Sequence, residues 1–210
     1  MSAARRSRML RPDMWTTTSR SVRVAAMVLA AASPTPADGP RAVDTGRSKL
    51  TVHVYKSGLF SAFADNHVIE APVASGSMVE GSSPRVEIRV RAADLRVLDP
   101  GLSTDRRAEV QSRMVGAEVL DVAKFPDISF ASTSIDTAGE GRWKVAGQLT
   151  LHGQTRAVTF AVAQTGGVYR GEVTIKQRDF GIEPIRVAGG AVKVKDEVKI
   201  AFEIVPASLG

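Results

Sequence analysis

Hydrophobic and polar residues alternate with a period of two in three consecutive runs between residues 124 and 162. The apolar or small positions of the second run are Trp143, Val145, Gly147, Leu149 and Leu151. Because successive side chains of a strand point to opposite faces, each run predicts a β-strand with one dry face and one solvated face. The glycine-containing segments 139–141 and 153–154 lie between the runs and predict hairpin turns.

The same alternation predicts further strands on both sides of this stretch. They cover residues 50–55, 85–91, 168–176, 179–187 and 197–205. Residues 92–123 lack the period, and Ser103 followed by helix-forming residues predicts one or two short helices within residues 103–120. Residues 56–76 are irregular and predict a loop or a short helix over one end of the structure.

Together these segments predict an all-β fold of about eight antiparallel strands. Strands with one apolar face need a second sheet, or closure into a barrel, to bury that face. We expect the last strand to pair with the first, which removes the exposed edges of the sheet. A closed barrel of this size can hold one small or slender ligand.

The apolar faces of the strands form one long inner wall if the barrel closes. The predicted wall residues are Val54, Phe63, Val86, Ile88, Val90, Ile128, Phe130, Val145, Leu149, Leu151, Phe160, Val173, Ile175, Phe180, Ile200 and Phe202. Most of them are slender aliphatic residues, which leaves room for an acyl-like chain. The alternative is a core filled by these same side chains, as in many small barrels.

The segment FPDISFASTSID at residues 125–136, followed by VAGQLTLHGQTRAVTF at residues 145–160, closely resembles the signature of the YceI-like family of polyisoprenoid- and lipid-binding periplasmic proteins. The resemblance continues in VLDVAKFPDISF upstream and in IKQRDFGIEPIRV and VKDEVKIAFEI downstream. It implies a lipocalin-like antiparallel β-barrel domain over residues 47–206 that holds a long isoprenoid chain in its interior. Residues 56–76 depart from the family pattern, in which we expect a strand rich in glycine and phenylalanine.

This resemblance implies binding, and sequestration or transport, of a polyisoprenoid or similar amphiphilic lipid, with transient contact to a membrane. If the lipid carries a phosphate head group, that group must sit at the mouth of the barrel. The candidate partners for it are Lys56, Arg113, Lys176 and Arg178. The alternative function is a structural or stress-linked interaction module with a filled core.

Signals for catalysis or metal binding are weak. The histidines are His53, His67 and His152, and no HExxH or closely paired histidine motif is present. Carboxylates near the strand ends lack a spacing typical of general acid–base catalysis, and there is no GxSxG motif. The sequence therefore predicts no enzyme, no cofactor and no metal site. A metal-assisted hydrolase that uses His67 and Asp65 is a minor alternative.

Residues 1–32 are typical of an export signal, because arginines precede a short apolar run at residues 24–32 that ends in small residues. The run is too short to span a bilayer. Residues 33–46 are rich in proline, glycine and small polar residues and predict a flexible linker. We therefore expect a periplasmic or secreted protein. The alternatives are translation from Met14, twin-arginine export, or a basic tail on a cytoplasmic protein.

The net charge is concentrated in this leader. The formal net charge is +6, but residues 1–37 contain six arginines and a single aspartate. The remainder is close to neutral and has no long basic run, so the electrostatic footprint of a nucleic-acid-binding protein is missing. The chain has no cysteine, which excludes disulfides and thiol chemistry.

Overall fold

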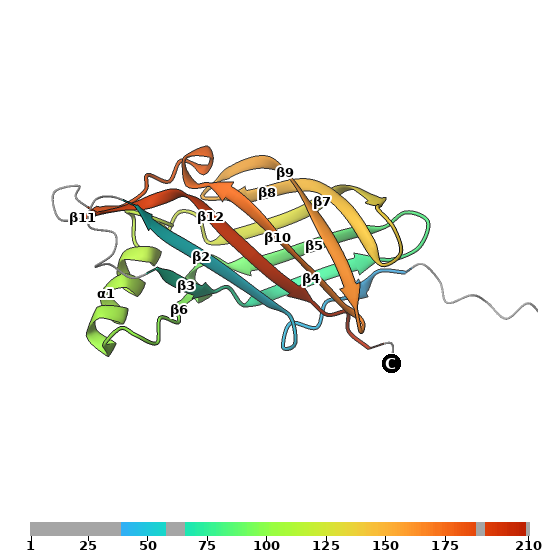
Figure 1. Ribbon diagram of the computed structural model, residues 1–210, viewed down its shortest axis with the longest axis horizontal. Coiled ribbons are helices and arrows are strands. Elements are labelled where there is room, and N and C mark those ends of the chain that lie inside the picture. The colour runs from blue at the N-terminus through green and yellow to red at the C-terminus, as the bar shows by residue number, and fades with distance from the viewer. Residues whose placement is uncertain (1–38, 58–65, 188–191, 209–210) are drawn as a thin grey trace, which may run out of the picture. The chain divides into compact units, whose positions relative to one another are not determined.

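Apart from residues 179–187, which form only a two-residue strand at 186–187 after a 3-10 turn, the predicted strands form in the computed structural model of the protein, which describes residues 39–57, 66–187 and 192–208 (Figure 1). They are β2 (Lys49–Ser57), β5 (Arg85–Arg91), β7 (Asp127–Thr137), β8 (Arg142–Leu151), β9 (Gln154–Thr165), β10 (Val168–Lys176) and β12 (Val192–Ile204). Their pairings with one another are antiparallel. The alternation of apolar and polar residues therefore located these strands correctly.

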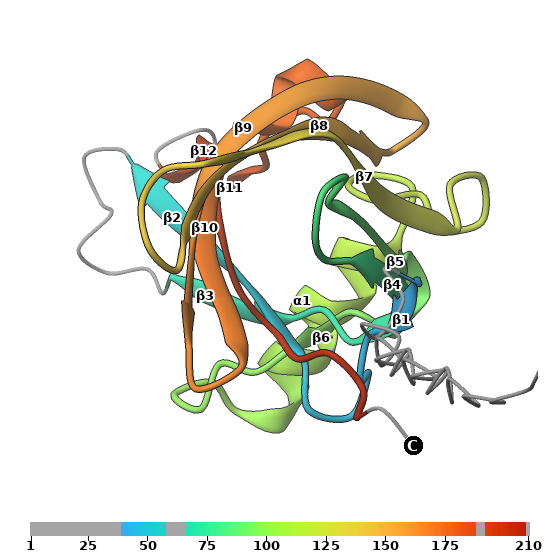
Figure 2. The same cartoon turned by 90° about the vertical axis from the view of Figure 1, so that its right-hand side faces the viewer.

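Shorter strands complete the sheet. They are β1 (Arg41–Ala42), β3 (His67–Glu70), β4 (Val73–Val79), β6 (Arg96–Val97) and β11 (Arg186–Val187). Hydrogen-bonded neighbours follow the order β4-β5-β7-β8-β9-β10-β12-β2-β3, and β3 continues along the chain into β4 through Ala71 and Pro72. The polypeptide itself therefore completes a ring (Figure 2). With β3 and β4 counted as one bent strand the ring has eight strands, and the predicted antiparallel barrel is confirmed.

The last long strand pairs with the first, as the sequence predicts. The facing pairs on the inner side are Leu50–Phe202, Val52–Ile200 and Val54–Val198. Apolar cross-strand pairs of this kind each contribute roughly 0.2–1 kcal/mol to the stability of a sheet.

The assignment of residues 33–46 to a flexible linker is wrong for the part that the structure describes. Arg41 and Ala42 pair with Met78 and Ser77 of β4. Val43 is only 5% exposed and forms a β-bridge with Pro206. The free edge of β4 needs a partner, and Arg41 and Ala42 supply it despite their proline-rich surroundings.

The prediction of a loop or helix across residues 56–76 missed β3 and the start of β4, and residues 58–65 lie outside the described residues. A register shift between Val73 and Ser75 interrupts the alternation of β4. Pro72 has no backbone N–H to donate, which marks the bend between the two strands. Short strands with a bulge and small residues carry too weak a period to be detected in the sequence.

The helix expected within residues 103–120 is α1 (Thr104–Val115). Ser103 caps it, because its Oγ accepts a hydrogen bond from the backbone N–H of Arg106. Gln111 fixes α1 to the sheet edge: its Oε1 accepts from the N–H of Val97 at 2.9 Å and its Nε2 donates to the carbonyl of Leu95 at 2.8 Å. No helix in the described segments has the length and hydropathy of a membrane span.

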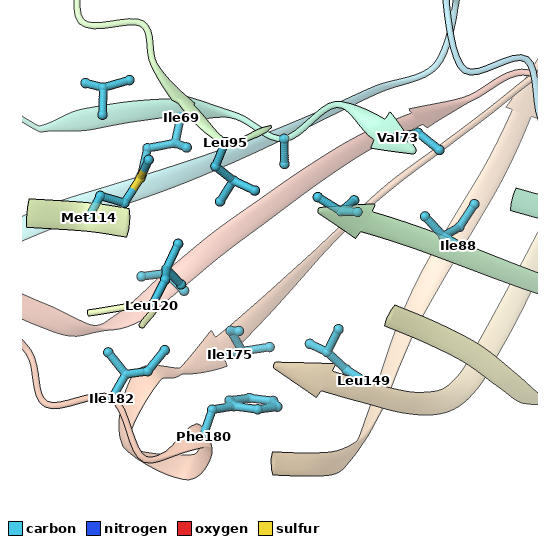
Figure 3. Packing of buried hydrophobic residues seen from close by; sticks show 14 of the residues in the cluster. Ile69, Val73, Ile88, Leu95, Met114, Leu120, Leu149, Ile175, Phe180 and Ile182 are labelled. Atoms are coloured by element: carbon cyan, nitrogen blue, oxygen red, sulfur yellow. The ribbon is translucent and has the colours of Figure 1, made fainter. Parts of the chain in front are cut away.

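α1 lies at the end of the barrel opposite the β4–β5 hairpin (Figure 1). Buried side chains gather at the α1 end (Figure 3). They include Leu95, Met114, Leu120, Phe180 and Ile182. Full burial of side chains of this size contributes about 1.5–3 kcal/mol each, so this cluster holds the helix against the barrel.

Candidate functional site

An apolar cavity of about 550 Å³ lies inside the barrel. Every strand of the ring contributes inward-facing residues to its wall, and most of these residues are valine, leucine, isoleucine or phenylalanine. The volume falls within the range of roughly 300–1,000 Å³ that is typical of small-molecule sites. The core is therefore not filled by its own side chains.

Fourteen of the sixteen predicted wall residues line this cavity. They are Val54, Val86, Ile88, Val90, Ile128, Phe130, Val145, Leu149, Leu151, Phe160, Val173, Ile175, Ile200 and Phe202. Phe63 lies outside the described residues. Phe180 does not belong to the wall: it is 1% exposed and lies in the 3-10 turn η3 (Gln177–Phe180), where it packs in the cluster at the α1 end.

Part of the wall was not predicted from the sequence. Leu50 and Val52 share the alternation of Val54 and could have been included. Ile69 and Met78 lie on β3 and β4, which were not predicted. Met114 of α1 and the following Leu120 carry no strand period, and only the packing of the helix brings them to the cavity.

Three phenylalanine rings cross the wall in a continuous band. The ring centroids of Phe130 and Phe160 are 5.4 Å apart, and those of Phe160 and Phe202 are 5.3 Å apart. Gly147 belongs to β8, which pairs with β7 and β9, and Gly171 belongs to β10, which pairs with β9 and β12. A Cβ atom at Gly147 would collide with the ring of Phe130, and one at Gly171 would collide with the ring of Phe202. The glycines therefore let the rings lie close to the sheet, which leaves the centre of the barrel free.

The two ends of the cavity differ in exposure and chemistry. At the α1 end the lining residues Leu95, Met114, Leu120 and Ile182 are buried, and we call them the floor. At the opposite end the lining residues Ser82, Thr137 and Gln164 are exposed to solvent. Together with Glu80, Trp143 and Tyr169 they form the mouth. The cavity is therefore closed by apolar side chains at one end and opens among polar side chains at the other.

Glu80 is held at the mouth by two partners from distant parts of the chain. Nη1 of Arg41 donates to Oε2 of Glu80 at 3.0 Å, and the hydroxyl of Tyr169 donates to Oε1 at 2.5 Å. Burial, and then the carboxylate of Glu80, raise the pKa of Tyr169. The tyrosine therefore stays a neutral donor. The ring of Trp143 lies 5.6 Å from that of Tyr169 and supports it from the side.

None of the four predicted head-group partners lines the cavity. Arg113 pairs with Glu118 at 3.4 Å, and Arg178 pairs with Glu183 at 3.4 Å. Lys176 is exposed and follows the inward-facing Ile175, so strand alternation turns it outward.

Lys56 is the fourth of these candidates. Burial lowers the pKa of its ammonium group, and the nearby Asp99 opposes that shift. These four side chains lie toward the α1 end of the barrel, whereas the solvent-exposed lining is at the other end. The cavity geometry therefore gives no support to their contact with a head group.

The histidines occupy separate structural positions. His67 contacts Asp99 through Nδ1 at 2.6 Å, and Asp99 is 4% exposed. His152 lies in the β8–β9 turn with a φ of 50°, and its ring centroid lies 4.4 Å from that of Phe125, with the two rings tilted by 58°. No group of three or more histidine, aspartate or glutamate residues that could hold a metal ion occurs among the described residues. Asp65 lies outside them.

Comparisons with known proteins agree with the architecture. A family model described as YceI-like domain matches residues 42–205. A UPF0312 protein of Pseudomonas putida is 35% identical over 86 residues, which are 36% of this chain and 45% of that protein. The chain thus matches less than half the length of this relative.

Two solved structures share the fold. BcnA of Burkholderia cenocepacia has a TM-score of 0.61 at 21% identity, over 79% of this chain and 99% of that chain. A polyisoprenoid binding domain from Saccharophagus degradans has a TM-score of 0.54 at 13% identity, over 80% and 98% of the respective chains. At these identities the likeness concerns the fold alone.

Proposed function

The chain belongs to the YceI-like domain family, and on that premise we propose that its barrel binds a polyisoprenoid or a similar long-chain amphiphilic lipid and sequesters or transports it. The observation that carries this proposal is the apolar cavity of about 550 Å³, closed at the floor and open at the mouth. The polyisoprenoid binding domain from Saccharophagus degradans, which has the same fold, supports it.

The size of the cavity limits the length of the buried chain. At about 30 Å³ for each water-sized group in a liquid, the cavity has room for roughly eighteen carbon atoms. Each buried methylene contributes about 0.8 kcal/mol, before the cost of ordering the ligand is subtracted. A longer lipid extends through the mouth, with its polar head in solvent or at a membrane surface.

In this proposal the protein performs no chemistry on its ligand. The wall of the cavity offers mostly apolar contacts, and the mouth offers hydrogen bonds. The alternative of an interaction module with a filled core loses its main argument, because the core contains a large cavity. We also propose that the protein acts outside the cytoplasm, since residues 1–32 have the composition of an export signal.

Blocking the cavity tests the proposal. Val173 lines the cavity, and its neighbour Thr174 on β10 is exposed on the outer face. We expect Val173→Trp to abolish binding of a C20 isoprenoid alcohol, measured by displacement of a fluorescent apolar probe. The matched variant Thr174→Trp should bind like the wild type. Equal binding by folded V173W and wild-type protein would contradict a ligand site inside the barrel.

A further inference from the structure

Resting on the lipid-binding function proposed above, we propose that Glu80 makes the mouth selective for amphiphiles with an uncharged head group and against those with a phosphate or carboxylate. This assigns a specificity-determining role to a residue that no motif singled out. It also reverses the sequence-based expectation that cationic side chains receive the head group.

Strand alternation places the carboxylate of Glu80 at the inner side of the mouth. Glu80 follows β4 two residues after Met78, which is buried and lines the cavity. Its partner Tyr169 lies on the same face of β10 as Val173 and Ile175, both of which line the cavity. The hydrogen bond between Tyr169 and Glu80 therefore forms where a head group would emerge from the apolar wall.

The cation that contacts Glu80 is already engaged by two partners. Nη1 of Arg41 is engaged by Glu80, and Nη2 donates to the carbonyl of Ala207 at 2.9 Å. The pair of Arg41 and Glu80 is neutral as a whole, so a phosphate would lose hydration without gaining a free positive partner. It would also approach the carboxylate of Glu80, and like charges at close range repel one another.

Uncharged head groups find suitable partners in the same place. Thr137 and Gln164 line the mouth and offer a hydroxyl and an amide, which both donate and accept hydrogen bonds. An alcohol or a carbonyl can therefore replace its lost hydrogen bonds to water without a charge penalty. The mouth therefore selects ligands by the chemistry of their head group, whereas the wall binds the apolar chain of any of them.

Among the described residues, Arg85 is the second charged residue that lines the cavity, after Glu80. It alternates with the inward-facing Val86, Ile88 and Val90 on β5 and is exposed. Because Arg85 is exposed and alternates with the inward-facing positions, we expect water to screen its charge. Arg85→Gln should leave the preference for uncharged heads unchanged.

The experiment compares two probes with the same chain: a C20 isoprenoid alcohol and its monophosphate. Binding of each to the full-length chain is measured by calorimetry at fixed salt. We expect the wild type to bind the alcohol at least about tenfold more tightly, because the phosphate meets an uncompensated charge cost. Glu80→Gln should raise the affinity for the phosphate about tenfold and change that for the alcohol less than twofold. Arg41→Gln should weaken the phosphate further, because it leaves the Glu80 carboxylate without its counter-charge.

Glu87→Gln is the matched control, since Glu87 is an exposed, outward-facing residue of β5. It should change neither affinity. Equal or tighter binding of the phosphate by the wild type, an unchanged ratio in E80Q, or loss of phosphate binding in R85Q would each overturn the role of Glu80. Failure of folded wild-type protein to bind either probe would instead refute the lipid-binding function, and the selectivity with it.

Discussion

Replacing Gly147 by alanine tests whether a glycine keeps the barrel empty. A Cβ atom on Gly147 would lie 2.5 Å from Cε2 of Phe130 and 2.5 Å from the backbone oxygen of Ala131. The oxygen belongs to β7, the hydrogen-bonded neighbour of β8, and cannot move far without disturbing the sheet. The ring of Phe130 must turn away from the wall, and the backbone of β8 must also shift to relieve the contact with the oxygen. Because Phe130 lines the cavity, the ring then enters the space that the ligand would fill.

The expected cost follows from two opposing effects. Replacing glycine by alanine inside a strand favours the folded state by about 0.5–1 kcal/mol, because the unfolded chain loses freedom. Overpacking of a well-packed wall costs about 1–3 kcal/mol. We expect G147A to lower the free energy of unfolding by up to about 2.5 kcal/mol, which is the balance of these effects. The displaced ring should also shorten the chain that the cavity accepts.

Urea denaturation and a ligand series measure the two consequences separately. The matched control is Gly101→Ala, because no heavy atom lies within 4 Å of a Cβ atom at Gly101. That variant should be unchanged or more stable by about 0.4–1 kcal/mol. Binding of isoprenoid alcohols with fifteen and twenty carbon atoms then reports on the cavity. If G147A equals G101A in both stability and chain-length preference, the argument that the glycine keeps the ring against the wall is refuted.

Three further predictions concern other parts of the molecule. The affinity for a homologous series of long-chain alcohols should rise with chain length to roughly eighteen carbons and then level off, because further carbons remain outside the cavity. A continued rise of the affinity at the same slope would contradict the closed floor. Gln111→Ala should lower the free energy of unfolding by about 1–3 kcal/mol and speed amide exchange at Val97, because a backbone donor and acceptor lose their partner; unchanged exchange would contradict it. The raised pKa of Tyr169 means that above about pH 10 the folded protein keeps a proton that the unfolded chain releases. The free energy of unfolding should therefore fall as the pH rises through that range, and it should fall less steeply in Tyr169→Phe, as denaturation at several pH values can measure. Parallel pH profiles of the two proteins would refute this linkage.

The fold could be predicted as far as local alternation specifies it. The runs of β8 and β9 bury one face and are joined by a two-residue turn, in which His152 and Gly153 adopt the positive φ values that such a turn requires. Such hairpins are encoded by neighbouring residues. β1, β3 and β6 are only two to four residues long and form because longer strands present a free edge to them. Their formation depends on tertiary structure, which no local period reports.

Alternation of apolar and polar residues predicts the wall of the candidate site, but it does not show whether that wall encloses a cavity. Alternation identifies the face on which Val145 and Leu149 lie, but a filled core and an empty one have the same alternation. Whether the core is empty depends on where the large side chains can pack against the sheet, as the ring of Phe130 does over Gly147. The order of the strands around the ring brings such pairs together.

The direction of the cavity explains why the predicted head-group candidates lie away from its mouth. A lysine or arginine near a strand end is equally compatible with either end of a barrel, and only the position of α1 decides which end is closed. Gln111 ties α1 over one end, and Met114 and Leu120 then seal it with apolar side chains. In the function proposed above, a slender lipid therefore enters tail first through the opposite end, and its head lies beside Glu80 and Tyr169, which are hydrogen-bonded to each other. The helix thus determines the chemistry that meets the head group, although it lies at the far end of the barrel.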